Sequence, residues 1–248
     1  MSDEGPAFYD NEEVFQTYLQ HRHRPDNPND TLEKPVLLEL LGAVRGTYIL
    51  DLGCGEAALG KELLAQGAVT YLGLDGSRNM VARATHTLEG TAGSVIQADI
   101  RMWAYPVQAF DRVISRLALH YIEDIAHVFQ SVFQSLRPGG RFVFSVEHPV
   151  ITSCDRAYQA GRVRQGWIVD DYFAVGPRMT HWLGGQVIKY HRTVEAYFGG
   201  LQNAGFVVES VRESQPQRQQ FSQEETYRRR KRIPLFLFFA ARKPSRSA

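Results

Sequence analysis

Short apolar runs alternate with amphipathic stretches along the first 150 residues of the chain. The runs are rich in Val, Ile and Leu, which is typical of strands buried on both faces. Between them, apolar residues recur every three or four positions, a spacing that indicates helices with one buried face. This alternation favours a parallel sheet covered by helices. Strands are expected at 47–52, 69–74, 94–98, 111–115 and 141–146, with two more at 206–211 and 233–241.

Two segments do not follow this rhythm. Residues 1–34 carry a helical pattern that Pro25 and Pro28 bring to an end. Residues from about 150 to 192 are rich in aromatic and glycine residues, and we expect them to form a small lid inserted after the fifth strand. A chain of 248 residues, 44% of them hydrophobic, can hold both segments within a single domain spanning 1–248.

The first predicted strand ends in a glycine-rich turn, Asp51-Leu-Gly-Cys-Gly55. Gly53 and Gly55 permit positive φ and close approach of a ligand, and the following helix directs unpaired N–H groups at the same place. The pattern Gly53-x-Gly55-x-x-Ala58 also satisfies a loose dinucleotide motif, with Asp75 at the spacing of a ribose-binding acid, which leaves NAD open. Asp51 suits a positively charged cofactor better than a pyrophosphate.

Each of the first three predicted strands ends on a carboxylate, namely Asp51, Asp75 and Asp99. In open parallel sheets, ligands lie beyond the carboxyl ends of the strands. We therefore expect the three side chains to converge on one crevice, although they are far apart in the sequence.

Five ordered motifs resemble those of the class I S-adenosylmethionine (SAM)-dependent methyltransferases, over roughly residues 35–147. An ordered set is far more specific than one glycine loop. The resemblance implies an α/β fold, with a Rossmann-like doubly wound sheet of seven strands whose last strand is antiparallel, and with residues 1–34 as a cap over SAM. Ala57 stands where the family often has a third glycine, which should narrow the loop. The motifs are Asp51-Leu-Gly-Cys-Gly55, Tyr71-Leu-Gly-Leu-Asp-Gly-Ser77, Gln97-Ala-Asp99, Phe110-Asp-Arg-Val-Ile-Ser115 and Leu136-Arg-Pro-Gly-Gly-Arg-Phe-Val-Phe144.

The resemblance also implies which residues contact SAM. Asp75 should accept hydrogen bonds from both ribose hydroxyls, and Asp99, with the backbone of Ile100, should meet the adenine amino group. Asp51 should lie near the sulfonium and the amino acid part. Structural roles stay open, because Asp99 can cap a helix, Asp51 can bond the loop amides and Cys54 can simply pack. The expected cofactor set is Asp51, Gly53, Cys54, Gly55, Asp75, Gly76, Ser77, Met80, Asp99, Ile100, Arg116, Tyr18 and Arg22, of which Tyr18 and Arg22 fit a surface helix equally well.

Two histidines follow strand ends at the rim where an acceptor would enter. His120 comes after the fourth predicted strand and His148 after the fifth, and a neutral imidazole is available near pH 7. Some small-molecule methyltransferases carry a similar Glu-His-Pro, so the resemblance favours His148 as the catalytic histidine, although a His before proline can simply fix a turn. A base is optional, because the leaving sulfur needs no proton. Further acceptor-site candidates, each with packing as the alternative, are Tyr121, His181, Trp182 and His191.

Charge and composition narrow the range of partners. The formal net charge is +1, which produces no global field toward nucleic acid or anionic membranes. The basic run 228–232 lies beside Glu224 and Glu225, and such a run is more often a solvated face than a phosphate contact.

No stretch approaches the ~18 apolar residues of a spanning helix, and the N-terminus lacks a signal-peptide pattern, so we expect a cytoplasmic protein that is not held in a membrane. Cys54 and Cys154 indicate neither a metal site nor a disulfide.

The predicted function is transfer of a methyl group from SAM to N, O or C of a small aromatic or heterocyclic metabolite or natural product, by a monomer or homodimer. The alternatives are a nucleic-acid (RNA) methyltransferase, an NAD-dependent Rossmann oxidoreductase and a non-catalytic SAM-binding protein. Against a nucleic-acid methyltransferase, the chain lacks an Asn/Asp-Pro-Pro-aromatic motif after the fourth strand, where Ser115-Arg-Leu-Ala118 stands. Against an NAD-dependent oxidoreductase, Asp51 would lie close to the pyrophosphate.

Overall fold

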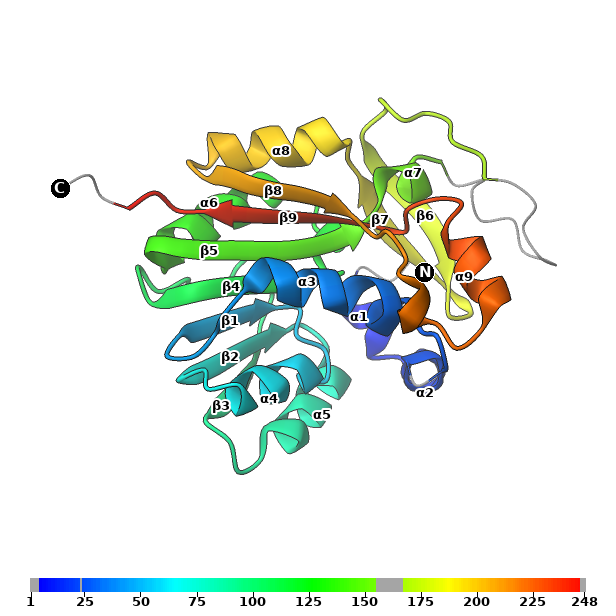
Figure 1. Ribbon diagram of the computed structural model, residues 1–248. Helices are drawn as coiled ribbons and strands as arrows, with labels where there is room; N and C mark the ends of the chain where they lie inside the picture. The colour runs from blue at the N-terminus through cyan, green and yellow to red at the C-terminus, as the bar shows by residue number, and fades with distance from the viewer. Residues whose placement is uncertain (1–4, 23, 155–166, 246–248) are drawn as a thin grey trace.

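Seven strands form one sheet in the order β3-β2-β1-β4-β5-β9-β8 in the computed structural model, which describes residues 5–22, 24–154 and 167–245 (Figure 1). Neighbours from β3 to β5 pair in parallel, whereas β9 is antiparallel to both β5 and β8. The predicted doubly wound sheet with an antiparallel last strand is therefore confirmed. The strands are β1 Tyr48–Leu52, β2 Thr70–Asp75, β3 Gly93–Gln97, β4 Phe110–Arg116, β5 Leu136–Glu147, β8 Val207–Glu213 and β9 Phe236–Arg242.

Helices cover both faces of this sheet and form two separate cores. One core contains Leu37 and Leu63 from helices α3 and α4, packed with Phe238 of β9. The other contains Phe129 and Tyr197 from helices α6 and α8. Each such fully buried side chain stabilises the fold by about 1.5 to 3 kcal/mol, so both faces of the sheet are held firmly. The helices are α3 Lys34–Leu41, α4 Ala58–Ala65, α5 Arg78–Leu88, α6 Ile125–Ser135 and α8 Val194–Asn203.

Short polar side chains fix the starts of two helices. Ser77 accepts a hydrogen bond from the N–H of Met80 at the start of α5, and Thr193 caps α8 in the same way. Helix α4 begins only at Ala58, because Ala57 adopts a left-handed conformation with φ of +55°. Strand β5 begins earlier than predicted, because Leu136 already pairs with β4 across an irregularity in register.

The segment predicted as a lid contains a regular β-hairpin, formed by β6 Gly176–Trp182 and β7 Gly185–His191. Leu183 and Gly184 both have positive φ at its turn, which is the geometry that two-residue hairpin turns prefer. A short helix, α7 Pro149–Thr152, links β5 to this insertion, and residues 155–166 of the predicted lid lie outside the described residues.

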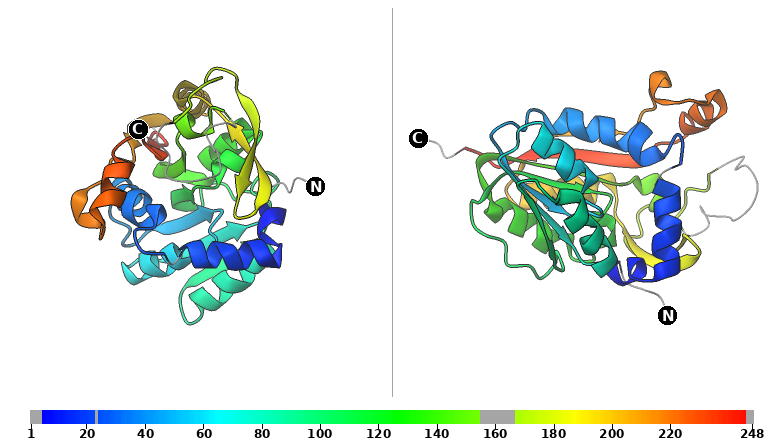
Figure 2. Two further views of the ribbon diagram at one scale, coloured as in Figure 1. Left: turned by 90° about the vertical axis from the view of Figure 1, so that its right-hand side faces the viewer. Right: turned by 90° about the horizontal axis from the view of Figure 1, so that it is seen from below.

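Three peripheral parts surround the carboxyl ends of the parallel strands. Figure 2, left, looks onto this end of the molecule and shows the hairpin (yellow) and helix α9 (orange) on opposite sides, with α2 (blue) below the hairpin. The N-terminal part comprises α1 Pro6–Tyr9, α2 Glu12–Arg22 and a π-helical turn at Asn29–Glu33, and α9 spans Glu224–Arg230. Within the described ranges, none of the helices is long and apolar enough to cross a membrane.

Candidate active site

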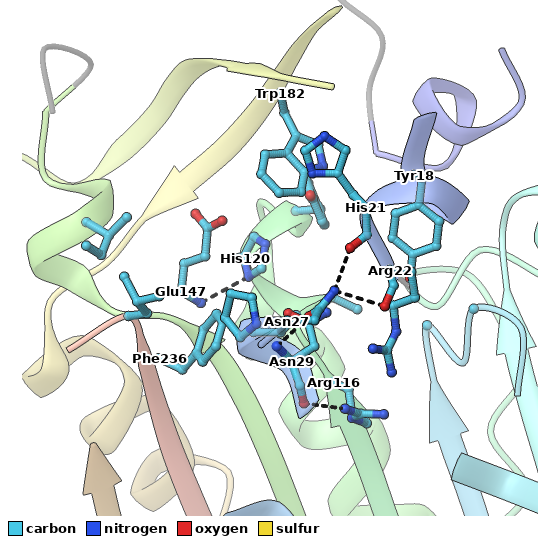
Figure 3. Close-up of a pocket in the computed structure, with 18 of the residues that line it drawn as sticks. Tyr18, His21, Arg22, Asn27, Asn29, Arg116, His120, Glu147, Trp182 and Phe236 are labelled. Carbon is cyan, nitrogen blue, oxygen red and sulfur yellow. Dashed lines mark hydrogen bonds between the residues drawn. The ribbon is translucent and has the colours of Figure 1, made fainter. Parts of the chain in front are cut away.

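A cavity of about 830 Å³ opens at the carboxyl ends of the parallel strands. It is lined by the glycine turn, the ends of β2 and β4, the N-terminal segment, the hairpin and the region of α9 (Figure 3). Most of the expected cofactor residues lie on its wall, and they occupy one half, which we call the donor half. The residues of the expected cofactor set that lie on the wall are Tyr18, Arg22, Gly53, Gly55, Asp75, Gly76, Met80, Asp99, Ile100 and Arg116.

The glycine turn needs both of its glycines, for different reasons. Gly53 has φ of +73°, and a Cβ built on it would lie 2.4 Å from the Cβ of Ala118. Gly55 has φ of +54°, and its N–H donates to Asp75 Oδ2 at 2.8 Å. A Cβ on Gly55 would meet no atom within 4 Å, because that side of the turn faces open space. The turn thus packs closely against Ala118 at Gly53, whereas the space beside Gly55 is open to a ligand.

Asp75 is held in place by the backbone. Its second oxygen, Oδ1, accepts from the N–H of Ser77 at 3.0 Å. Burial raises the pKa of Asp75, and the hydrogen bonds from Ser77 and Gly55 oppose that shift. A carboxylate has about four acceptor positions, so two remain on Asp75 for a ligand in the cavity.

Asp51 lies behind the turn and is 2% exposed. Tyr71 donates to its Oδ2 at 2.7 Å, whereas Oδ1 is buried with no hydrogen-bond partner among the described residues. Burial raises the pKa of Asp51 to about 7, and nearby Asp75 adds to the shift. The Tyr71 ring occupies the space that a side chain at Gly60 would fill. An orphan carboxylate oxygen behind a glycine cradle fits a ligand that carries positive charge.

Asp99 lies at the other end of the donor half. The guanidinium of Arg101 contacts both of its oxygens, and the N–H of Arg101 donates to Oδ1 at 2.8 Å. These hydrogen bonds hold the pKa of Asp99 below its usual value, so Asp99 is an anionic acceptor. The Arg101 side chain is 43% exposed.

Arg116 and Arg22 close the donor half on the side of the N-terminal segment. Arg116 donates through Nε and Nη2 to Oε2 of Glu33, which is fully buried and whose Oε1 accepts from the Ser145 hydroxyl at 2.7 Å. Arg22 pairs with Asp30 at 2.5 Å. Tyr18 lies beside them, with its ring 5.4 Å from that of Tyr9. Both arginines are therefore already positioned by carboxylates of the N-terminal segment.

The remaining half of the cavity, which we call the acceptor half, is lined by His120, Tyr121, Glu147 and Trp182 and lies beside the hairpin. The N–H of Glu147 donates to His120 Nδ1 at 3.3 Å, which leaves the ring hydrogen of the neutral form on Nε2. Burial lowers the pKa of His120 to about 3, so the ring is neutral at physiological pH. The Tyr121 phenol lies 3.3 Å from that of Tyr9, and the indole N–H of Trp182 is buried without a partner in the described parts of the chain.

Glu147 and Lys189 form an ion pair that attaches the hairpin to the sheet. Lys189 is 1% exposed, and its Nζ lies 2.6 Å from Glu147 Oε1 and over the rings of Tyr121 and Trp182. Burial alone would raise the pKa of Glu147, but Lys189 and His120 hold it below its usual value. Glu147 lines the cavity as a carboxylate.

The other predicted site residues lie outside the cavity wall. His148 accepts from the N–H of Val150 at 3.2 Å and contacts Glu213 at 2.9 Å, which turns it toward strand β8. His191 is buried between Thr152 and the Tyr172 carbonyl, and His181 contacts Gln186 on the exposed hairpin. Ser77 caps α5, and Cys54 packs against Gly73.

Sequence reasoning missed several residues on the wall. At the end of β5 the prediction chose His148 and not the adjacent Glu147. The position of Glu147 as the last residue of that strand could have predicted its place on the wall. The arginines of the basic run 228–232 were interpreted as a solvated face, and Arg24 was not among the predicted site residues. No local sequence pattern predicts that these side chains line the cavity. The missed basic residues are Arg24, Arg229, Arg230 and Arg232.

Comparisons with known proteins agree with this geometry. Residues 49–140 match a family model described as a methyltransferase domain. An uncharacterized protein of Haemophilus influenzae is 30% identical over 252 residues, covering 96% of this chain and 97% of that protein. The ubiquinone/menaquinone biosynthesis C-methyltransferase of Vibrio parahaemolyticus is 28% identical over 182 residues, 71% of this chain and 70% of that protein.

A solved structure also resembles this chain over most of its length. The crystal structure of an S-adenosylmethionine-dependent methyltransferase from Mesorhizobium loti is 39% identical, with a TM-score of 0.79, and covers 85% of this chain and 97% of that one. The similarity is not limited to the glycine turn and its neighbours, because it covers nearly the whole of that protein. The chain therefore belongs to the SAM-dependent methyltransferases.

Proposed function

We propose that this SAM-dependent methyltransferase acts on a small aromatic or heterocyclic acceptor and methylates it at N, O or C. The observation that carries the proposal is one cavity with two unlike halves, an anionic nucleoside site and an aromatic chamber roofed by Tyr121 and Trp182. Concave, largely apolar sites of this kind suit small ligands. The name of the Vibrio relative, from ubiquinone and menaquinone biosynthesis, supports the same class of acceptor.

In the donor half, the free acceptor positions of Asp75 serve the ribose hydroxyls. Asp99 and Ile100 serve the adenine, which requires Asp99 to share the lone pairs that Arg101 now uses. Asp51 supplies negative charge near the sulfonium, since its orphan oxygen gains from a nearby cation. Arg22 and Arg116 are placed to receive the methionine carboxylate at the edge of the N-terminal segment.

SAM, when bound, supplies an electrophilic methyl group on a sulfonium. The new bond from the acceptor atom to the methyl carbon forms as the carbon–sulfur bond breaks. Sulfur keeps the electron pair as the thioether of S-adenosylhomocysteine, and the acceptor gives up one proton to water or to a nearby base. What the chain must provide is alignment and exclusion of water, which together lower the barrier by several kcal/mol.

His120 and Glu147 orient the acceptor in this scheme. His120 is neutral with its hydrogen on Nε2, so it donates a hydrogen bond to an oxygen or nitrogen of the acceptor rather than removing a proton. Glu147, held ionised by Lys189, accepts from a hydroxyl or amine on the same molecule. The pair thus fixes both a donor and an acceptor contact on one side of the chamber.

Two measurements test the proposal. Calorimetric titration of SAM tests the donor half, and formation of S-adenosylhomocysteine with a panel of phenols, aromatic amines and quinols tests the acceptor half. We expect turnover with at least one aromatic nucleophile and its loss in Glu147→Gln, with SAM affinity unchanged. Tight SAM binding without turnover of any aromatic acceptor would contradict the assigned acceptor class and leave the donor site intact.

A further inference from the structure

Four arginines line the cavity on the side of α9, which lies opposite the hairpin (Figure 2, left). Arg229 and Arg230 come from α9, Arg232 follows it, and Arg24 comes from the turn after α2. Arg24, Arg229 and Arg232 are exposed at the cavity wall. The two segments that supply these charges are far apart in the sequence and meet only in the folded chain.

A specific contact holds the two segments together. The carboxylate of Asp26 accepts from the N–H and the hydroxyl of Ser222 at 2.8 and 2.9 Å, and from the N–H of Gln223 at 3.1 Å. Gln223 immediately precedes α9. The start of α9 is therefore fixed to the turn that carries Arg24, and the arginine cluster has a defined position.

Only part of the basic run faces the cavity. Arg218 and Arg228 both pair with Glu224, at 2.8 and 2.9 Å, and neither lines the cavity. Arg24 and Arg229, in contrast, form no salt bridge within the described ranges. A purely solvated helix would gain nothing from directing its cationic residues to a concave wall, because like charges repel there.

The same cavity also has apolar lining. Leu235 and Phe236, which follow Arg232 in the sequence, lie on its wall, and so do Ile151 of α7 and Ile188 of the hairpin. A ligand that fills this space would place an apolar body against these residues and a polar group at the arginines.

We propose, on the basis of the proposed function, that the acceptor is an organic anion, whose carboxylate or phosphate is held by Arg24, Arg229 and Arg232 while its aromatic body enters the chamber. Guanidinium groups bind both kinds of anion through charge-assisted, often bidentate, hydrogen bonds. Under this proposal, the carboxylates of the donor half complement the cationic sulfonium of SAM, and the arginines complement the anionic group of the acceptor.

The test uses matched aromatic probes on the full chain loaded with S-adenosylhomocysteine. 2-Naphthoate, 2-naphthyl phosphate and uncharged 2-naphthamide share one ring system, so differences in their affinity report the anionic group. We expect naphthoate or naphthyl phosphate to bind about ten- to a hundredfold more tightly than naphthamide, as lost charged hydrogen bonds typically cost. The ratio between the two anions identifies which group the arginines prefer.

Variants locate the effect. Arg229→Ala with Arg232→Ala should remove at least about tenfold of the anion preference. Arg228→Ala removes one positive charge from the helix that carries Arg229, but Arg228 pairs with Glu224, so this variant should leave the preference unchanged. Affinity for S-adenosylhomocysteine and the thermal midpoint should be equal in all three proteins, which controls for folding.

Three outcomes would overturn the proposal: equal affinity for naphthoate and naphthamide, binding of none of the probes, and equal loss in Arg228→Ala and in the double variant. Tighter binding of a single-stranded RNA oligonucleotide that depends on Arg228 as well as Arg229 would also overturn it, in favour of a polynucleotide surface. Retained affinity for S-adenosylhomocysteine in any of these cases would leave the donor site standing.

Discussion

The donor half of the cavity draws most of its residues from one stretch between Asp51 and Ile100, whereas the acceptor half is assembled from segments spread over the whole chain. In the donor half, backbone N–H groups position Asp75, although Arg22 and Arg116 are held by carboxylates of the N-terminal segment. In the acceptor half, side chains hold other side chains, as in the pairs Glu147–Lys189 and Asp26–Ser222. Under the proposed function, recognition of SAM therefore depends mainly on one stretch of the sequence, and recognition of the acceptor depends on packing between distant segments.

Asp75→Ala should have the largest effect and should affect the donor half alone. The change removes the carboxylate that holds the amides of Gly55 and Ser77, and SAM affinity should fall about a hundredfold or more. Calorimetry with SAM gives this number. Affinity for an aromatic acceptor probe should stay within about twofold, and a parallel loss at both halves would show that they are one cooperative unit.

Gly53→Ala tests how tightly the turn is pressed against Ala118. A Cβ at 2.4 Å from Ala118, added to a positive φ, should lower the free energy of unfolding by about 2 to 3 kcal/mol. Gly46→Ala is the matched control, because Gly46 has φ of +76° and open space around its Cβ position. Denaturant unfolding should show a cost of only about 1 kcal/mol there. Equal costs would mean that the contact with Ala118 is irrelevant.

His120→Ala and His148→Ala distinguish the two predicted histidines. His120 lines the cavity and His148 does not, so turnover should fall about tenfold or more only in the first variant. SAM affinity should be unchanged in both. If only His148→Ala reduces turnover in a fully folded protein, His120 does not contact the acceptor and the acceptor binds elsewhere than in the acceptor half.

The pH dependence of SAM binding should report Asp51. Its pKa of about 7 in the free protein should fall when a cationic ligand binds, so affinity should rise with pH up to about 7, by at most about tenfold per pH unit. Because the pKa is raised above its unfolded value, burial of Asp51 also makes the free protein less stable as pH rises from about 4 to 7. Asp51→Asn should flatten both profiles, and an unchanged slope in this variant would assign the titration to another group.

Ala57→Gly should give the smallest effect, in the stabilising direction. Ala57 has φ of +55°, and glycine adopts this conformation without the steric cost, so unfolding should require about 0.5 to 1 kcal/mol more. Ala58→Gly, one residue further and inside α4, should instead destabilise by about 0.5 to 1 kcal/mol. The same sign for both variants in denaturant unfolding would exclude strain at Ala57.

The sequence by itself determined the fold class, the approximate positions of the strands, and the carboxylates at the ends of the parallel strands. These features follow from local rules, because hydrophobic periodicity sets each element and a strand that ends on Asp75 or Asp99 must deliver its carboxylate to the same edge of a parallel sheet. The cap of α5 at Ser77 was predictable for the same reason.

Tertiary structure alone decided the acceptor half. The sequence placed His120 and His148 at equivalent strand ends, but contacts with Glu147 on one side and Glu213 on the other sent them to different places. Likewise, Arg228 and Arg229 are neighbours in one basic run, and the docking of α9 at Asp26 separates them into a solvated residue and a cavity residue. Such outcomes depend on pairings between distant segments, whose energies no local pattern contains.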